Sequence, residues 1–153
     1  MNDAVTDPTE LTEVTYVRVF DAPRELVFAC MLDPKHLTHF WGPTGMSTPL
    51  DRIVIEPWVG GVFKTVMVND ETGEEYAGSG RYTEIVEPSR LAWVEDDTPT
   101  TATTDFIDLG DGRTEVRIHQ TNIPAMFTTA EAQAGFKSSL DRFAAHLATL
   151  QAA

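Results

Sequence analysis

The chain has little cysteine, little positive charge and no long apolar run. Cys30 is its only cysteine, so no disulfide can form within the chain and a metal site built from several thiolates is excluded. Eleven Lys and Arg stand against 24 Asp and Glu, which gives a net charge of −13. Because nucleic-acid affinity rests on basic side chains that neutralise phosphates, we expect no nucleic-acid partner. No apolar stretch approaches the ~20 residues of a membrane span. We therefore expect no membrane partner and a cytoplasmic protein.

The amino-terminal segment differs in composition from the rest of the chain. Residues 1–11 are polar and acidic and contain Pro8, which favours a disordered tail with no signal peptide or anchor. Residues 12–153 contain the apolar residues and turn residues of an ordinary globular domain. At this length the sequence predicts one domain with a core of its own.

The last segment carries apolar residues at spacings of three and four, which follow one face of an α-helix. These residues are Ala132, Phe136, Leu140, Phe143, Leu147 and Leu150. Thr128 and Glu131 fit a capping box at the start of this helix. Gly135 weakens the helix and needs a reason, such as close approach to a sheet or space for a bound molecule. So wide an apolar face needs a sheet to pack against.

Alternating apolar and polar residues, separated by turn residues, predict seven strands. They cover residues 13–20, 47–56, 62–68, 75–86, 90–95, 102–109 and 113–121. Two short helices follow the first strand, one opening at Asp21-Ala22-Pro23 and one at Asp33-Pro34, with Gly42-Pro43 closing the second. Hairpin turns link most later strands, so the sheet is antiparallel and the fold class is α+β.

Several short motifs in this order are similar to those of a known superfamily. They are Ala22-Pro23 with Val27-Phe28, Asp33-Pro34 with Phe40-Trp41-Gly42-Pro43, Gly60-Gly61-Val62-Phe63, Gly80-Arg81-Tyr82-Thr83-Glu84-Ile85 and Pro88-Ser89-Arg90-Leu91. Over residues 13–150 the chain resembles the START-like (SRPBCC) superfamily. Within it, the chain resembles the family named for the carboxy-terminal domain of an activator of a heat-shock chaperone ATPase. The resemblance implies the helix-grip fold, a curved antiparallel sheet around a long carboxy-terminal helix. Gly135-Phe136 stands where the family often has a Gly-Trp pair.

A curved sheet that wraps one helix leaves room for a cavity between them. Strand alternation predicts which side chains face that space. We expect the cavity to be lined by Trp41, Phe63, Thr65, Met67, Tyr76, Tyr82, Trp93, Glu95, Phe106, Ile118, Gln120, Phe136 and Leu140. This set is aromatic and aliphatic with few polar groups, as is usual for a small-molecule site. The alternative is that these side chains fill a solid core. For Glu95 we favour a place at the open end of its strand, beside Asp96 and Asp97, over a buried acid or base.

The histidines and the cysteine offer weaker signals. His36 and His39 lie three residues apart and could begin a metal site, but the sequence marks no third ligand, so we favour a solvated helix face and no metal. His119 and His146 stand beside no obvious Ser, Cys or carboxylate partner. Cys30 falls among apolar residues and is predicted to be buried in the core.

These observations predict a protein that binds an apolar, aromatic or lipid-like small molecule in the cavity. We predict no catalytic residue and no cofactor, because no phosphate loop, dinucleotide fingerprint or nucleophile motif is present. The resemblance implies two alternatives: a cyclase- or hydrolase-type enzyme on the same fold, or a regulator of a chaperone ATPase. A monomer and a homodimer both remain open.

Overall fold

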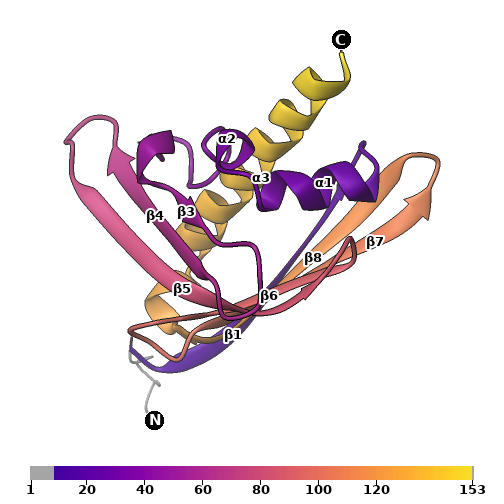
Figure 1. The fold of residues 1–153 in the computed structure, drawn as a ribbon. Coiled ribbons are helices and arrows are strands. Elements are labelled where there is room, and N and C mark those ends of the chain that lie inside the picture. Colours follow the sequence, from indigo (N-terminus) through magenta and orange to yellow (C-terminus); the bar gives the residue numbers. More distant parts are fainter. Residues whose placement is uncertain (1–8, 153) are drawn as a thin grey trace.

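The computed structural model describes residues 9–152 and forms one curled sheet with helices against it (Figure 1). In chain order the elements are β1 (Leu11–Phe20), α1 (Arg24–Met31), α2 (Pro34–Leu37), β2 (Met46–Ser47), the 3₁₀ turn η1 (Leu50–Arg52), β3 (Val54–Ile55), β4 (Val62–Asn69), β5 (Glu75–Val86), β6 (Arg90–Glu95), β7 (Thr101–Gly110), β8 (Arg113–Pro124), the 3₁₀ turn η2 (Ala125–Phe127) and α3 (Ala130–Gln151).

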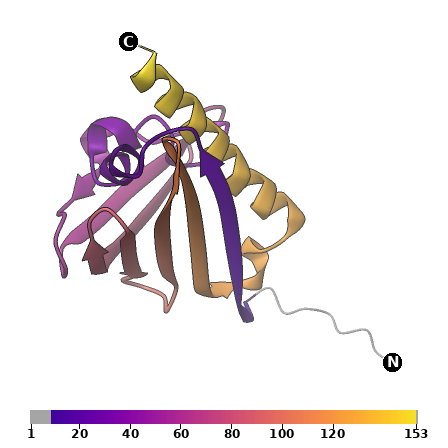
Figure 2. The same cartoon turned by 90° about the vertical axis from the view of Figure 1, so that its right-hand side faces the viewer.

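All strand pairs are antiparallel, and the order across the sheet is β1-β8-β7-β6-β5-β4-β2, with β3 also pairing with β4. Consecutive strands from β4 to β8 are neighbours because short turns join them. The first strand, β1, pairs with β8 and forms one edge of the sheet. The sheet curls so that α3 lies along its inner side, while α1 and α2 lie beside the carboxy-terminal half of α3 (Figure 1; Figure 2). The predicted α+β helix-grip fold is confirmed.

One predicted strand is divided in the structure. Instead of a strand over 47–56, β2 pairs with the end of β4 and β3 pairs with its beginning, so the described sheet has eight strands rather than seven. Pro49 has no N–H to give to a strand ladder, and the chain turns through η1 directly after it. At the amino terminus, β1 already begins at Leu11, within the predicted tail, and residues 1–8 of that tail lie outside the described residues.

The predicted helix of the last segment is α3, although it begins one residue later than the capping box implied. The Thr129 hydroxyl accepts a hydrogen bond from the Ala132 N–H at 3.1 Å and caps the helix. The Thr128 hydroxyl instead donates to the Ala125 carbonyl at 2.9 Å, which closes η2. Of the predicted stripe, Leu140, Phe143 and Leu147 are buried, while Phe136 and Leu150 pack against the core from its edge.

Helix α3 is held by rings and by the loop after α2. Phe143 stacks on Phe40 with ring centroids 3.9 Å apart, and Phe136 stacks on Tyr16 of β1 at 4.1 Å. The Arg142 guanidinium donates to the carbonyls of three loop residues, Gly42, Pro43 and Met46, at 2.8–3.1 Å. None of the helices within residues 9–152 is both long and apolar enough to cross a membrane.

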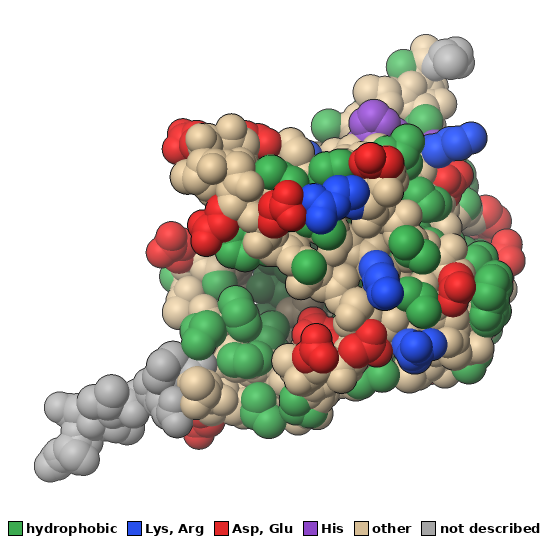
Figure 3. All heavy atoms as spheres, turned by 60° about the vertical axis from the view of Figure 1, so that its left-hand side comes forward, with side chains coloured by type: hydrophobic (Ala, Val, Ile, Leu, Met, Phe, Trp, Pro, Cys, Tyr) green, Lys and Arg blue, Asp and Glu red, His purple; other side chains and the backbone are tan. Residues whose placement is uncertain are grey.

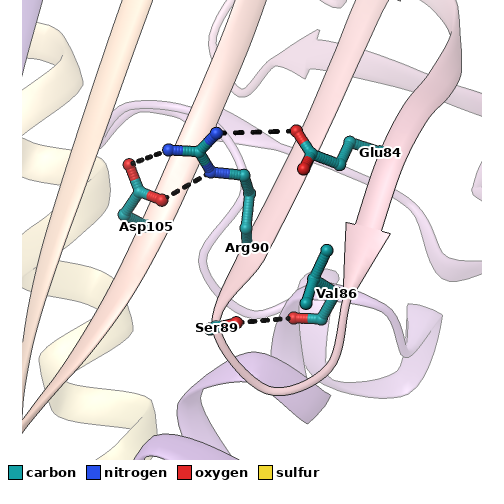
Figure 4. A network of polar contacts seen from close by, with 5 residues as sticks. All are labelled: Glu84, Val86, Ser89, Arg90 and Asp105. Atoms are coloured by element: carbon teal, nitrogen blue, oxygen red, sulfur yellow. Dashed lines mark hydrogen bonds and ion pairs between the residues drawn. The ribbon is translucent and has the colours of Figure 1, made fainter.

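The Pro88-Ser89-Arg90-Leu91 motif has a structural role on the outer side of the sheet (Figure 4). The Arg90 guanidinium donates two hydrogen bonds to the Asp105 carboxylate on β7, at 2.7 and 3.2 Å, and lies 3.6 Å from a carboxylate oxygen of Glu84 on β5. The Ser89 hydroxyl donates to the Val86 carbonyl at 3.2 Å across the turn. Arg90 thus ties three neighbouring strands together where β5 turns into β6.

Candidate ligand cavity

A cavity of about 200 Å³ lies against the inner face of β4, β5 and β6, with the loop after α2 as its other wall. Its lining is Trp41, Phe63, Thr65, Met67, Tyr76, Ala77, Gly78, Ser79, Gly80, Trp93 and Glu95. Figure 3 brings the β4 and β5 side of Figure 1 toward the viewer and shows a hollow there. Hydrophobic side chains border one side of this hollow and acidic side chains border another.

Aromatic rings form the inner end of the cavity. Strand alternation points Phe63, Thr65 and Met67 of β4 to the same face. The Phe63 ring lies edge-on to Trp41 and to Trp93, with centroids 5.2 and 5.3 Å apart, which is a favourable arrangement for aromatic pairs. The two indole rings are 6.1 Å from each other. Three rings from three different segments therefore line the inner end of one cavity that opens to solvent.

Two glycines on β5 border the cavity, and only one of them leaves open space. Gly80 and Gly78 lie opposite Phe63 and Thr65 in the register of β4 and β5. A Cβ at Gly80 would come within 2.5 Å of the Val94 carbonyl oxygen, so this glycine is required by close packing against β6. A Cβ at Gly78 would meet only the Thr65 hydroxyl oxygen, at 3.9 Å. The space beside Gly78 is therefore open, and a side chain placed there would enter the cavity.

Polar groups lie at the exposed end of the cavity. Tyr76 is 45% exposed, and its hydroxyl donates to a Glu74 carboxylate oxygen at 2.8 Å. That hydrogen bond, with some desolvation, raises the pKa of Tyr76. Glu95 is exposed and accepts a hydrogen bond from the Thr98 hydroxyl at 2.9 Å, which agrees with the place at the open strand end that we favoured. Among the described lining residues, the ionisable groups are thus at the mouth and the inner part is neutral.

Seven of the predicted lining residues border this cavity: Trp41, Phe63, Thr65, Met67, Tyr76, Trp93 and Glu95. Their role in binding a ligand stays a prediction. The predicted lining set left out Ala77, Gly78, Ser79 and Gly80 of β5, although strand alternation places Gly78 and Gly80 on the same inward face as Tyr76. The available signal was a pair of glycines on the inward face of a long strand, which removes side-chain volume where a core would need it.

The other six predicted residues do not border this cavity. Tyr82 is buried behind Phe63, and burial raises its pKa. Phe106 and Ile118 belong to the packed core. Phe136 stacks on Tyr16. Gln120 is half-buried on β8, opposite Val14 of β1 and Ala102 of β7.

The reason for the difference is that helix α1 covers part of the inner face that we assigned to α3. Phe28 of α1 meets Phe106 of β7 edge-on, with ring centroids 5.2 Å apart, and fills the space over that strand. None of the described residues that border the aromatic cavity belongs to α3. The aromatic cavity thus lies at the β4–β6 end of the sheet, whereas a separate cleft lies at the expected place, between the sheet and the carboxy-terminal helix.

Leu140 borders a separate, larger cleft of about 400 Å³ between β1 and α3. Its other lining residues are Thr15, Tyr16, Val17, Arg18, Gln133 and Lys137. The Arg18 guanidinium is paired with the Asp141 carboxylate at 2.8 Å beside it. Charged and polar side chains surround this cleft, so the smaller aromatic cavity suits an apolar guest better.

The histidines have partners that the sequence did not reveal. His36 Nδ1 and His146 Nε2 are 3.0 Å apart, and the exposed His39 ring stacks on His146 at 4.6 Å, so the face that we expected to be solvated is partly solvated and is shared with α3. Burial, with smaller effects of His39 and His36, lowers the pKa of His146. Cys30 is buried as predicted, and burial together with the Asp33 charge raises its pKa to about 11.

His119 also has neighbours, contrary to our expectation. Its Nδ1 lies 2.7 Å from the Thr15 hydroxyl oxygen, and its Nε2 lies 3.4 Å from a Glu13 carboxylate oxygen. Both partners are on β1, which the sequence alone did not place beside β8. His119 does not border the aromatic cavity, so we assign it no part in the proposed binding site.

Solved structures share this fold along nearly their whole length. A protein of Chromobacterium violaceum is 27% identical, with a TM-score of 0.80 over 88% of this chain and 96% of that one. A protein of Nitrosomonas europaea, 19% identical, has a TM-score of 0.81 over 92% and 97%. A protein of Silicibacter pomeroyi whose name includes AHSA1, 24% identical, has a TM-score of 0.76 over 92% and 100%. No curated protein sequence matches the chain.

The sequence also matches a family of proteins directly. The match runs over residues 21–148, from the turn after β1 to the last turns of α3, and so includes every element that borders the aromatic cavity. The chain therefore belongs to the family described as Activator of Hsp90 ATPase homolog 1-like protein.

Proposed function

We propose that this protein binds a small apolar molecule, about the size of one or two aromatic rings, in the cavity against β4–β6. The observation that carries the proposal is a cleft of about 200 Å³, open to solvent on one side, whose inner end is lined by three aromatic rings opposite a glycine, Gly78, that leaves space. A concave site with an aromatic lining and a few polar groups at its mouth is typical of small-molecule sites.

The volume limits the guest. Ordinary pockets for drug-sized ligands measure roughly 300–1,000 Å³, whereas an apolar cavity of about 150 Å³ takes up benzene. The present cavity lies between the two, so a single ring, a fused pair of rings or a short branched chain is the expected guest. A long lipid chain would not fit without movement of the walls.

The polar groups at the mouth suggest how a guest would be oriented. The Tyr76 hydroxyl and the Glu95 carboxylate lie at the exposed end, and the Thr65 hydroxyl is buried within. A guest with an apolar body and one hydrogen-bond donor would place its body among the rings and its donor toward Glu95. The acidic mouth disfavours anionic guests, because like charges repel.

Native mass spectrometry of gently purified protein tests the proposal. We expect a bound species that adds the mass of one small molecule to the wild type and is absent from Gly78→Phe, which places a ring in the cavity. Ile107→Phe adds the same ring at an exposed position of β7 and should keep the bound species. If Gly78→Phe retains the same bound mass as the wild type, the molecule sits elsewhere and the proposal fails.

Of the two alternatives, the enzyme rests on the superfamily and the chaperone-ATPase regulator on the family description. Among the described residues of the cavity, the ionisable side chains are Tyr76 and Glu95, both largely exposed and neither paired as an acid and base. Both alternatives therefore stay predictions of the sequence.

A further inference from the structure

A cysteine and two histidines from three helices lie close together, and none of them borders the aromatic cavity. The Cys30 thiol sulfur and one ring nitrogen from each of His36 and His146 all lie within 4.8 Å of one another. Cys30 comes from α1, His36 from α2 and His146 from α3. The two nearest donor atoms, His36 Nδ1 and His146 Nε2, are 3.0 Å apart.

The 3.0 Å between the two nitrogens is near that of a tetrahedral metal site, and the sulfur lies within 4.8 Å of both. With metal–nitrogen bonds near 2.0 Å and metal–sulfur bonds near 2.3 Å, tetrahedral geometry places donor atoms about 3.3–3.6 Å apart. Binding of an ion would require side-chain rotations that bring the three donors to this spacing. A thiolate with two imidazoles is a donor set that zinc and similar borderline-soft ions prefer over calcium or magnesium.

The orientation of His36 adds an independent argument. Its Nδ1 faces His146, while its Nε2 lies 3.9 Å from the Asp33 Oδ2. The other oxygen of Asp33 accepts a hydrogen bond from the Lys35 N–H at 2.9 Å and caps α2, which fixes the carboxylate in place. Histidines that bind metals commonly donate their second N–H to a carboxylate, and Asp33 lies just beyond hydrogen-bond distance of this nitrogen.

The three donor residues differ in their exposure to solvent. Cys30 is fully buried, whereas the His36 side chain is 30% exposed and His146 is half-buried. The two imidazoles are thus the solvent-facing donors of the cluster, and the thiol is the buried one. The His39 ring lies nearly parallel to His146, 14° from coplanar, and so packs against it rather than pointing a nitrogen at the cluster. The fourth position is left for water.

We propose that Cys30, His36 and His146 bind a transition-metal ion of the zinc class, with Asp33 positioning His36. The ion would join α1, α2 and α3, and its binding free energy would add to the stability of the fold. This site is separate from the aromatic cavity, and neither proposal depends on the other.

Cobalt titration of the chelator-treated protein tests this site. Co²⁺ in a tetrahedral site with a thiolate should give a sulfur-to-metal charge-transfer band and intense visible d–d bands, and Zn²⁺ should displace them. We expect His36→Gln, His146→Gln and Cys30→Ala each to weaken binding by about tenfold or more, and Asp33→Asn by about tenfold. Only Cys30→Ala should abolish the charge-transfer band entirely.

His119→Gln is the matched control, because this histidine lies on β8 away from the cluster and should bind cobalt as the wild type does. Far-ultraviolet circular dichroism reports whether each variant folds. If Cys30→Ala does not fold, the cobalt affinity of His36→Gln, a change at a partly exposed position, decides the result. Zinc should also raise the melting temperature of the wild type and of His119→Gln but not of His146→Gln. A cobalt spectrum without thiolate bands, or equal affinity of the wild type and His146→Gln, would overturn the proposal.

Discussion

Single atoms decide much of this structure, and Thr104 shows how. Its side chain is fully buried on the inner face of β7, and among the described residues its hydroxyl has no hydrogen-bond partner. An enclosed hydroxyl without a partner is costly, because it has lost its bonds to water. By contrast, the buried Thr114 hydroxyl donates to the Ala22 carbonyl at 2.7 Å and so is satisfied.

We expect Thr104→Val to stabilise the protein by roughly 1 kcal/mol, since the change keeps the shape and removes the unpaired hydroxyl. Thr114→Val is the matched control and should destabilise it, because the Ala22 carbonyl would lose its donor. Urea denaturation measures both free energies of unfolding. A loss of stability in Thr104→Val would mean that this hydroxyl has a partner, such as an enclosed water molecule.

The Cys30 thiol should react slowly in the folded protein. It is fully buried, and its pKa of about 11 keeps it protonated at neutral pH, whereas the thiolate is the reactive form. We expect labelling of the metal-free native protein by a disulfide reagent at pH 8 to be at least about a hundredfold slower than labelling of the unfolded chain. Comparable rates in the two states would show that α1 opens readily.

At the scale of elements, α3 is fixed by contacts on two sides. Its buried face meets the core through Leu140, Phe143 and Leu147. Its other contacts reach the loop after α2, where the Ser138 hydroxyl accepts a hydrogen bond from the Thr44 N–H at 3.0 Å. Gly135 faces this loop rather than the sheet, because a Cβ there would lie 3.6 Å from the Pro43 Cβ.

Gly135→Ala should therefore stabilise the protein by about 0.5–1 kcal/mol, the usual gain for alanine over glycine inside a helix. The new methyl group would make an ordinary contact with Pro43 and would not enter the aromatic cavity. Thermal denaturation measures the change, with Ala134→Gly on the exposed side of the same turn as the reverse control. A lower melting temperature for Gly135→Ala would mean that the loop cannot accept the methyl group.

The sequence predicted the elements well because their signals are local. The periods of two and of about 3.6 residues identified the strands and α3, and turn residues identified most of their ends. It could not predict that α1 rather than α3 covers Phe106, since both helices offer suitable apolar faces. The cluster of Cys30, His36 and His146 was also invisible, because more than a hundred residues separate His36 from His146 in the chain.

At the scale of the whole molecule, the two proposed sites lie on different parts of one framework. The aromatic cavity uses the β4–β6 end of the sheet, and the metal cluster uses the helices. Trp41 belongs to the cavity and follows α2, which carries His36. The short segment from His36 to Trp41 is the closest link between them.

We expect the two sites to be independent in their determinants. Gly78→Phe should leave the cobalt spectrum unchanged, and His146→Gln should leave binding of an apolar probe within about twofold of the wild type, because neither residue touches the other site. Calorimetric titration of each variant with each ligand measures this. Loss of both cobalt binding and apolar-probe binding in one folded variant would show that the segment between His36 and Trp41 couples the two sites.

The most direct test of the apolar cavity is a titration of the protein with indole, and separately with toluene. Binding is measured by calorimetry or by the displacement of a fluorescent apolar probe. The wild type and Ile107→Phe should bind indole saturably at one site per chain, and Gly78→Phe should bind it at least about tenfold more weakly, a loss of about 1.4 kcal/mol or more. Absence of saturable binding of indole and toluene to the wild type, or equal affinity of Gly78→Phe, would contradict the account.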